Sequence, residues 1–377
     1  MRTPALERER ENSMNHEKTM RAVVMTAPGA FGLETIPRPN PTDNEVLCRI
    51  RAVAICGSDP EIFSGKLAGH WPPAYPFVAG HEWAGEIVAV GKNVTGLAVG
   101  DRVAGEAHCG CGHCQNCMEG RYNLCLNYGN FASGHRHYGF ITPGAYAQYQ
   151  VYDPKAVTKM PENLTFAEGS MNDTLGVALH GVELVGIRPG GTVVIIGPGP
   201  IGLCAMRVAR AKGAGRILMV GRGARLAAAG QFGADGLIDI QKQDPVEAVR
   251  ALTGGLGADT VLECSGAPGT LVQAVSMTRR GGRVSLIGVA KDEVREEVPF
   301  KYLAYNEIMV IGSKANPNAS RAALELMSSR QADVRPFITH RFLLEDFAEA
   351  LDTFVKRKGD AIKVVIYPNG YEEALER

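Results

Sequence analysis

A cysteine and a histidine stand 25 positions apart in this chain, each close to an acidic residue. Cys56 opens the stretch Cys56-Gly57-Ser58-Asp59, and His81 lies within Gly80-His81-Glu82-x-x-Gly85. Thiolate and imidazole groups bind Zn²⁺, and a catalytic zinc site has three protein ligands and one open position. A divalent ion lowers the pKa of a hydroxyl group that it binds. These residues therefore indicate an open zinc site at which an alcohol is made acidic.

A carboxylate is needed as the third protein ligand, and the sequence offers Glu82 and Asp173. Neighbouring residues rarely both reach one ion, so Asp173 is a better candidate than Glu82. With Cys56, His81 and Asp173 as ligands, water or an alcohol takes the fourth position. The alkoxide formed there releases a hydride readily, and in the reverse direction the same ion polarises a carbonyl group.

Five of the nine cysteines fall between residues 109 and 125. Four of them, Cys111, Cys114, Cys117 and Cys125, follow the pattern Cys-x2-Cys-x2-Cys-x7-Cys. Four thiolates complete a tetrahedral zinc site without an open position, so its expected role is structural. Cys109 could replace Cys111, although the even spacing favours Cys111. A redox cluster is the less favoured interpretation, and the charge balance disfavours a zinc ribbon that binds nucleic acid.

The charge and hydropathy of the chain exclude several classes of function. Lys+Arg and Asp+Glu both number 40 in 377 residues, which leaves no net charge. That balance gives no electrostatic basis for binding nucleic acid or an anionic membrane. No apolar run reaches the ~18–20 residues that span a bilayer. Residues 1–19 lack the apolar stretch of a secretory signal, so we expect a flexible extension and a cytoplasmic protein.

A glycine-rich loop follows the apolar run Thr192–Ile196 and reads Gly197-Pro198-Gly199-Pro200-Ile201-Gly202. In a dinucleotide-binding loop, the first glycine makes a tight turn and the second lets the backbone approach a pyrophosphate. The third lets the following helix pack on the strand. Pro200 suits the first turn of a helix, whose N-terminal N–H groups bind phosphate. The loop opens a series of alternating strand and helix patterns, and this context predicts a dinucleotide site.

The residues after the next strand should select the cofactor. The sequence there is Val220-Gly221-Arg222-Gly223-Ala224-Arg225, with no acidic residue to bind the ribose hydroxyls of NAD. Arg222 and Arg225 carry guanidinium groups that can pair with a 2′-phosphate. The sequence therefore favours NADP(H). NAD(H) stays possible if Arg222 and Arg225 are only solvated charges of the loop.

Two kinds of secondary-structure pattern position these residues. Before about residue 175, short strand-like runs alternate with glycine turns, which predicts a β-rich, barrel-like unit. These runs are Arg21–Met25, Glu45–Val53, Glu86–Val90 and Ala147–Val151. From residue 191, six apolar strands separated mostly by helical stretches predict a doubly wound parallel sheet, an α/β fold. They are expected at Thr192–Gly197, Arg216–Val220, Leu237–Ile240, Asp259–Glu263, Arg283–Gly288 and Glu307–Gly312.

The end of the chain has a different pattern. After Ser313, two helical patterns precede a last strand at Ile362–Tyr367. A single strand in this position often returns to the first domain, which would make that domain discontinuous.

Over roughly residues 20–367 the chain resembles the zinc-containing alcohol dehydrogenases of the medium-chain dehydrogenase/reductase superfamily. Gly80-His81-Glu82-x2-Gly85-x5-Gly91-x2-Val94 follows the zinc pattern of that family, and the four-cysteine segment and the glycine-rich loop stand in the family's order. The resemblance implies a GroES-like catalytic domain, residues 20–174 and 315–377, and a Rossmann domain, residues 175–314, with the active site between them. It also implies a catalytic and a structural zinc ion per chain, and a homodimer or homotetramer.

The resemblance also implies roles for single residues around the catalytic zinc. The third ligand of the family lies seven positions before a histidine, as Asp173 does before His180. Ser58 matches the hydroxyl that contacts the zinc-bound alcohol or relays its proton. Asp59 matches the carboxylate that orients the zinc-binding histidine. Glu82 matches the acidic neighbour that approaches the metal transiently.

Two positions depart from the pattern of many relatives. Glu61 stands where these relatives carry a relay histidine, so proton release takes another route or Glu61 contacts a polar substrate. The turn after Val220 is about one residue shorter than usual, which leaves open whether Arg222 or Arg225 meets the 2′-phosphate.

The sequence thus predicts a zinc-dependent oxidoreductase that transfers hydride between a secondary alcohol or polyol and NAD(P). Its partners are then a small alcohol or ketone, and neither nucleic acid nor a membrane. Two other functions stay open. One is a zinc-free quinone or enoyl reductase on the same fold, whose members lack the Cys56 and His81 pair. The other is a non-catalytic nucleotide-binding protein with one structural zinc.

Overall fold

The computed structural model describes residues 18–371, and the chain divides into two compact units. The first unit comprises the chain up to Asp173 and from His340 onward, and the second comprises Thr174–Thr339. Residues 315–339 therefore group with the second unit, whereas the sequence analysis placed them in the first. The extension expected at residues 1–19 lies almost wholly outside the described residues. Within residues 18–371, no helix is long and apolar enough to cross a bilayer.

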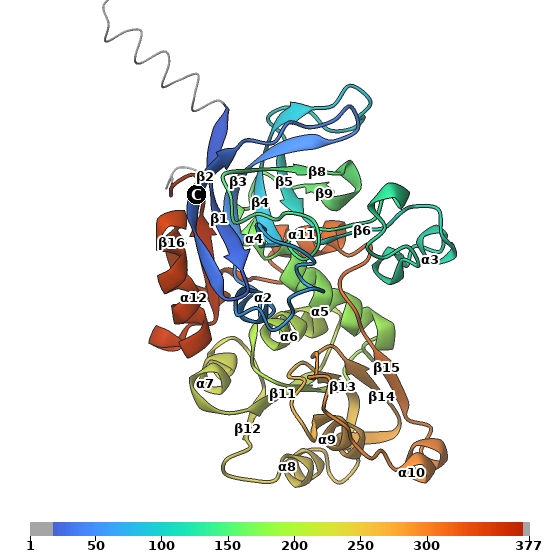
Figure 1. Cartoon of the computed structure of the whole chain (residues 1–377). Coiled ribbons are helices and arrows are strands. Elements are labelled where there is room, and N and C mark those ends of the chain that lie inside the picture. Colours follow the sequence, from blue (N-terminus) through green and yellow to red (C-terminus); the bar gives the residue numbers. More distant parts are fainter. Residues whose placement is uncertain (1–17, 372–377) are drawn as a thin grey trace, which may run out of the picture. The chain divides into compact units, whose positions relative to one another are not determined.

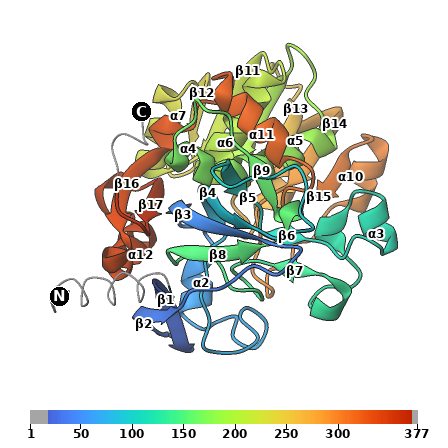
Figure 2. The same cartoon turned by 90° about the horizontal axis from the view of Figure 1, so that it is seen from above.

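A seven-stranded sheet forms the frame of the first unit, in the order β16-β17-β3-β4-β5-β9 with β8 also paired to β3. The last strand pairs antiparallel with β3 through Val365 and Ile366, and Figure 2 shows the red and blue segments side by side. The first unit is therefore discontinuous in sequence. The strands are β3 (Val46–Ala54), β4 (Glu82–Val90), β5 (Arg102–Gly105), β8 (Tyr149–Tyr152), β9 (Val157–Lys159), β16 (Ile338–Leu343) and β17 (Lys363–Tyr367).

Shorter elements complete the first unit. Two antiparallel pairs lie outside the main sheet, β1 (Thr19–Ala27) with β2 (Ala30–Pro37), and β6 (His108–Cys109) with β7 (Arg136–His137). The helices are α2 (Asp59–Phe63), α3 (Gln115–Met118), α4 (Phe166–Ser170) and α12 (Phe347–Lys356). Large buried aromatic side chains fill the core, among them Phe63, Trp83, Tyr146 and Tyr152.

Six parallel strands form the sheet of the second unit, in the order β12-β11-β10-β13-β14-β15. The central strand, β10, is a β-branched run with four of its five residues buried, as expected for a strand covered on both faces. In Figure 1, β13, β14 and β15 lie side by side. The strands are β10 (Thr192–Ile196), β11 (Arg216–Gly221), β12 (Gly236–Asp239), β13 (Ala258–Glu263), β14 (Thr278–Leu286) and β15 (Met309–Gly312).

Helices connect these parallel strands, and the fold class expected from the sequence is confirmed. The connecting helices are α6 (Pro200–Ala211), α7 (Gly223–Gln231), α8 (Pro245–Leu252), α9 (Thr270–Met277) and α10 (Phe300–Tyr305). Helix α5 (Asn172–Val185) precedes β10, and α11 (Ser320–Ser328) follows β15. The chain runs outward from β10 in both directions, so the strand order reverses between β10 and β13. In doubly wound sheets, ligands bind at the carboxyl ends of the strands at such a reversal. The glycine-rich loop that follows β10 lies at this point.

Candidate metal centres and nucleotide site

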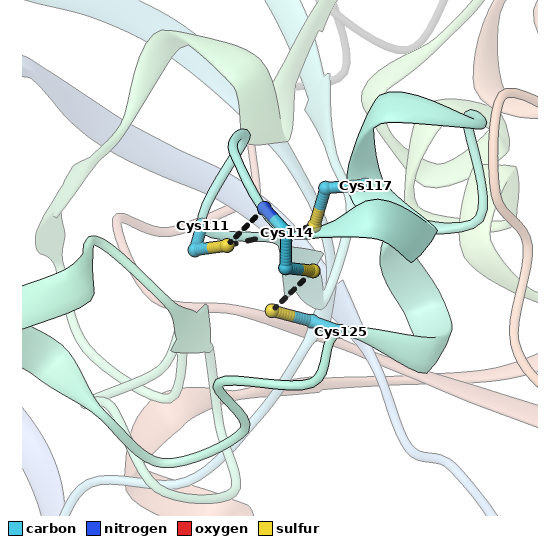
Figure 3. A group of neighbouring side chains, drawn as sticks. All are labelled: Cys111, Cys114, Cys117 and Cys125. Carbon is cyan, nitrogen blue, oxygen red and sulfur yellow. Dashed lines mark hydrogen bonds between the residues drawn. The ribbon is translucent and has the colours of Figure 1, made fainter.

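The four cysteines chosen from the sequence converge on one point, as Figure 3 shows. The sulfur atoms of Cys111, Cys114, Cys117 and Cys125 all lie within 4.8 Å of one another. The sulfurs of Cys111 and Cys117 are 3.8 Å apart, and those of Cys114 and Cys125 are 3.9 Å apart. A tetrahedron with Zn–S bonds of about 2.3 Å has sulfurs separated by about 3.8 Å. The spacing therefore fits a closed zinc site.

Nitrogen donors around this cluster favour thiolates. Asn127 Nδ2 lies 3.3 Å and the Cys114 backbone N–H lies 3.4 Å from the Cys111 sulfur. Burial opposes ionisation of Cys111, but hydrogen bonds from His113, Asn127 and Cys114 outweigh it and lower the pKa to about 5. Burial, with the neighbouring thiols, raises the pKa of Cys117 to about 12. Without a cation, the thiols therefore differ in how easily they ionise. A bound divalent cation would allow all four to ionise.

The open metal site is assembled by pairing of two adjacent strands. Cys56 follows the end of β3 and His81 precedes the start of β4, and Ala54 pairs with Glu82 in the β3–β4 register. One donor atom from each of Cys56, His81 and Glu82 lies within 4.8 Å of the other two. Cys56 and His81, which are 25 residues apart in the sequence, thus lie in one cluster. Its thiolate, imidazole and carboxylate are the donor types of a catalytic zinc site.

Asp173 lies near this cluster but is not a member of it. The residue is in the first turn of α5 and is buried, and its carboxylate accepts a hydrogen bond from the Ala107 backbone. Burial raises the pKa of Asp173 to about 6, against the opposing influence of His81. Electrostatic interaction with both His81 and Glu82 places the carboxylate beside the metal cluster. The structure therefore brings Glu82 closest to Cys56 and His81, with Asp173 in the surrounding shell.

Buried polar groups around His81 suit a metal-binding imidazole. His81 Nδ1 and Asp59 Oδ1 face each other at 3.9 Å, and neither has a hydrogen-bond partner among the described residues. Burial opposes a charge on His81, but Cys56, Asp59 and Asp173 outweigh it and raise the pKa to about 10. The buried Ser58 Oγ likewise lacks a partner within the described residues. Such atoms are costly to bury unpaired. A hydrogen bond between His81 Nδ1 and Asp59 Oδ1 would satisfy two of them and leave Nε2 for a metal, and a substrate hydroxyl would satisfy Ser58 Oγ.

Lys363 is a site residue that the sequence analysis missed. Its ammonium group, on β17, forms an ion pair with Glu82, and both side chains are 2% exposed. A signal was present, since a lysine within the apolar run Ile362–Tyr367 can be buried only when it is paired.

The glycine-rich loop has the geometry expected of a dinucleotide site. Gly197 has a φ of +101°, and a Cβ on Gly202 would lie 1.9 Å from the Gly197 carbonyl oxygen. Gly199 caps α6, whose first residues are Pro200 and Ile201, and a Cβ on Gly199 would meet nothing within 4 Å. Gly202 is thus required for packing within the loop. Gly199 leaves open space in front of the helix N-terminus, where phosphate binds.

The second strand ends against this loop. A Cβ on Gly221, the last residue of β11, would lie 2.3 Å from Pro198 Cδ. Arg222 follows as the exposed N-cap of α7, and Arg225 is half-buried in the first turn of that helix. Both arginines therefore belong to the segment that leaves β11 beside the phosphate loop.

Comparison with known proteins agrees with this geometry. The family model described as the alcohol dehydrogenase GroES-like domain matches residues 42–162, and the zinc-binding dehydrogenase model matches residues 200–329. The chain is 35% identical to a sorbitol dehydrogenase of Bacillus subtilis (strain 168), over 93% of this chain and 98% of that protein. It is 34% identical to an L-threonine 3-dehydrogenase of the same strain, over 92% of this chain and 98% of that protein. The chain belongs to the zinc-containing alcohol dehydrogenase family.

A solved structure extends the match to the fold. A zinc-binding dehydrogenase from Sinorhizobium meliloti 1021, crystallised with NADP, has a TM-score of 0.85 and 30% identity, with 93% of this chain and 99% of that chain covered. Membership of this family confirms the expected activity, an NAD(P)-dependent oxidation of an alcohol or polyol.

Proposed function

We propose that this dehydrogenase oxidises a secondary alcohol of a polyol, with a zinc ion held by Cys56, His81 and a carboxylate. The observation that carries the proposal is the convergence of Cys56, His81 and Glu82 in a chain that also has a dinucleotide loop. A sorbitol dehydrogenase and an L-threonine 3-dehydrogenase are close relatives, and both names describe oxidation of a hydroxyl in a polar molecule. When bound, zinc makes the substrate hydroxyl more acidic, and the nicotinamide accepts the hydride.

The residues of the chain have distinct parts in this reaction. Cys56 and His81 would hold the metal, and Asp59 would accept a hydrogen bond from the Nδ1–H of His81, which keeps Nε2 free for the ion. Ser58 Oγ is buried without a partner among the described residues, so we assign it to the substrate hydroxyl, from which it accepts a hydrogen bond. Glu61 stands where many relatives have a relay histidine. It is half-buried and lies on α2, two residues after Asp59.

Asp173 is our candidate for the third protein ligand. Glu82 lies nearer to Cys56 and His81, but its carboxylate is already neutralised by Lys363. Asp173 is buried beside the same cluster. Asp173→Asn should weaken zinc binding about 100-fold, and Glu82→Gln about 10-fold, within the range known for ligands and their supporting residues. Metal affinity measured by chelator competition decides between them, because the reverse order would make Glu82 the ligand.

We also propose two zinc ions per chain and a preference for NADP(H). The second zinc would occupy the four-cysteine cluster. For the cofactor, Arg222 and Arg225 supply positive charge next to the phosphate loop. The acidic residue of the neighbouring strand, Asp239, pairs in register with Gly221, but its carboxylate accepts the Gln241 N–H and pairs with Lys242.

Assembly and location complete the proposal. We expect a homodimer or homotetramer in the cytoplasm, where a reducing environment keeps the clustered thiols available for zinc.

The substrate is best found by a screen. Secondary alcohols, polyols and amino alcohols would be tested with NADP⁺ and NAD⁺, following the absorbance of the reduced cofactor. Turnover of a polyol that is faster with NADP⁺ supports the proposal. Turnover that continues unchanged after removal of the catalytic metal rejects it.

A further inference from the structure

Asp59 is fully buried, and its two carboxylate oxygens have different surroundings. Oδ2 accepts a hydrogen bond from the Cys56 backbone N–H at 2.8 Å and another from the Tyr146 hydroxyl at 2.6 Å. Oδ1 has no hydrogen-bond partner among the described residues and faces His81 Nδ1 at 3.9 Å. The carboxylate is therefore turned so that its free oxygen faces the imidazole.

We propose that Tyr146 is a positioning residue for the catalytic metal, because its hydroxyl fixes the orientation of Asp59 and Asp59 orients His81. This inference rests on the zinc site proposed above. It assigns a role to a tyrosine that lies 65 positions after His81 and 87 after Asp59 in the sequence.

The ring of Tyr146 is held firmly enough to act in this way. The side chain has no exposed surface, and its ring packs edge-on against Phe347 with centroids 4.6 Å apart. Phe63 contacts the ring from α2, the helix that begins at Asp59, with centroids 5.9 Å apart. These contacts pack the ring on two sides, with its hydroxyl hydrogen-bonded to the carboxylate.

The same tyrosine also contacts the backbone that leads into His81. The Tyr146 N–H donates to the Ala79 carbonyl oxygen at 3.0 Å, and the Ala145 N–H donates to the Gly80 carbonyl oxygen at 2.8 Å. Gly80 has a φ of +96°, and a Cβ there would lie 2.9 Å from the Tyr146 ring. Glycine at this position lets the ring lie directly against the backbone before His81. Tyr146 therefore contacts both Asp59 and the segment that leads into His81.

The positioning role belongs to the hydroxyl group of Tyr146 and not to its ring. A phenylalanine would fill the same aromatic space, and a buried hydroxyl without a partner costs free energy. Tyrosine is protonated at neutral pH and donates a charge-assisted hydrogen bond to a carboxylate. With Oδ2 so occupied, Oδ1 is left to accept a hydrogen bond from the Nδ1–H of His81. That contact holds the imidazole in the tautomer whose Nε2 binds a metal.

A matched control is available in the same unit. Tyr152 is also fully buried, and its ring stacks on Trp83 with centroids 4.2 Å apart. Its hydroxyl has no hydrogen-bond partner among the described residues. Tyr152→Phe therefore removes the same atom as Tyr146→Phe without breaking a bond to the metal site.

The test compares full-length protein carrying Tyr146→Phe, Tyr152→Phe, Asp59→Ala or the pair Asp59→Ala with Tyr146→Phe. The affinity of the catalytic site for Co²⁺ and Zn²⁺ is measured by chelator competition, together with the visible absorption of bound Co²⁺ and the thermal midpoint. We expect Tyr146→Phe to weaken metal binding about 10-fold and to change the Co²⁺ spectrum. Tyr152→Phe should keep the wild-type metal affinity and Co²⁺ spectrum without lowering the thermal midpoint, and Tyr146→Phe should add nothing to the loss of metal affinity in the Asp59→Ala background.

Several results would overturn this inference. One is wild-type metal affinity and an unchanged Co²⁺ spectrum in Tyr146→Phe. Another is an equal loss of affinity with and without Asp59, which would show that the hydroxyl acts elsewhere. A lower thermal midpoint with unchanged metal affinity would assign Tyr146 a purely structural role. If the wild-type protein bound no metal outside the four-cysteine cluster, the proposed function itself would be rejected. This outcome differs from the ones above, which reject only the role of Tyr146.

Discussion

The ammonium group of Lys363 and the carboxylate of Glu82 form an ion pair in which each side chain is only 2% exposed. Glu82 begins β4 at the metal cluster, and Lys363 begins β17, the last strand within residues 18–371. The C-terminal strand thus supplies the positive charge that allows a carboxylate to be buried beside Cys56 and His81. The return of the chain to the first unit is in this way part of the construction of the site.

Lys363→Met should destabilise the metal-free protein by about 3–5 kcal/mol, because it leaves Glu82 buried without its partner charge. Added zinc should recover part of this loss, since the ion compensates the carboxylate. Denaturant unfolding with and without zinc measures both effects. Lys92→Met is the control, because Lys92 and Asp43 form an exposed pair worth about 0–1 kcal/mol. Equal losses in the two variants would contradict a role for the buried pair.

Cys114→Ser should release one zinc ion per chain and lower the thermal midpoint, because the closed site needs all four sulfurs. Cys109→Ala should retain both ions, since the buried Cys109 lies outside the cluster within the described residues. The two variants are compared by their metal content, measured by mass spectrometry, and by thermal unfolding. Loss of zinc from Cys109→Ala would mean that the cluster includes a different set of cysteines.

Gly199→Ala and Gly202→Ala should separate cofactor binding from folding. A Cβ at position 199 meets nothing within 4 Å, so the variant should be stable but bind NADPH at least about 10-fold more weakly, because the methyl group occupies space that phosphate needs. A Cβ at position 202 would lie 1.9 Å from a carbonyl oxygen, so this variant should lose stability as well. Gly312→Ala, also free of contacts within 4 Å, is the control. Undiminished NADPH binding by Gly199→Ala would place the pyrophosphate elsewhere.

Asp259 should make the second unit sensitive to acid. Burial opposes its ionisation, but the Thr192 N–H, Arg279 and Arg188 outweigh burial and lower the pKa. A carboxyl whose pKa is lowered by folding stabilises the protein above its unfolded pKa, and this contribution is lost as the pH falls through the folded value. Asp259→Asn should therefore be less stable than the wild type at pH 7, with the difference shrinking below about pH 4. A difference that stays constant from pH 7 to pH 3 would contradict this account.

The sequence predicted the strands of the second unit from their apolar runs. The β-branched run of β10 is buried as a central strand, and the apolar segments predicted after it also form strands of this sheet. The helix α7 was not predicted, because its sequence Gly223–Gln231 begins with glycine after Arg222, without a side-chain cap. Strand β16 was also missed, since polar residues such as Thr339 and His340 interrupt its apolar pattern.

The metal site was only partly predictable for a related reason. Spacing and residue type identified Cys56, His81 and the acidic residues, because those groups are local signals of metal chemistry. Tyr146 carries no such signal. Lys363 stands out as a lysine within the apolar run Ile362–Tyr367, but this position does not show that its partner is Glu82. The contacts of these two residues to Asp59 and Glu82 depend on how distant segments pack, which a single sequence does not display.

Metal analysis of Cys56→Ser and His81→Ala, joined to an assay with the best alcohol substrate, tests the central claim most directly. Each variant should keep NADPH binding and the zinc of the four-cysteine cluster, but lose the second zinc. Turnover should fall at least about 10³-fold, since the metal supplies several kcal/mol of charge stabilisation. Full turnover with the Cys56 and His81 site empty would contradict the account.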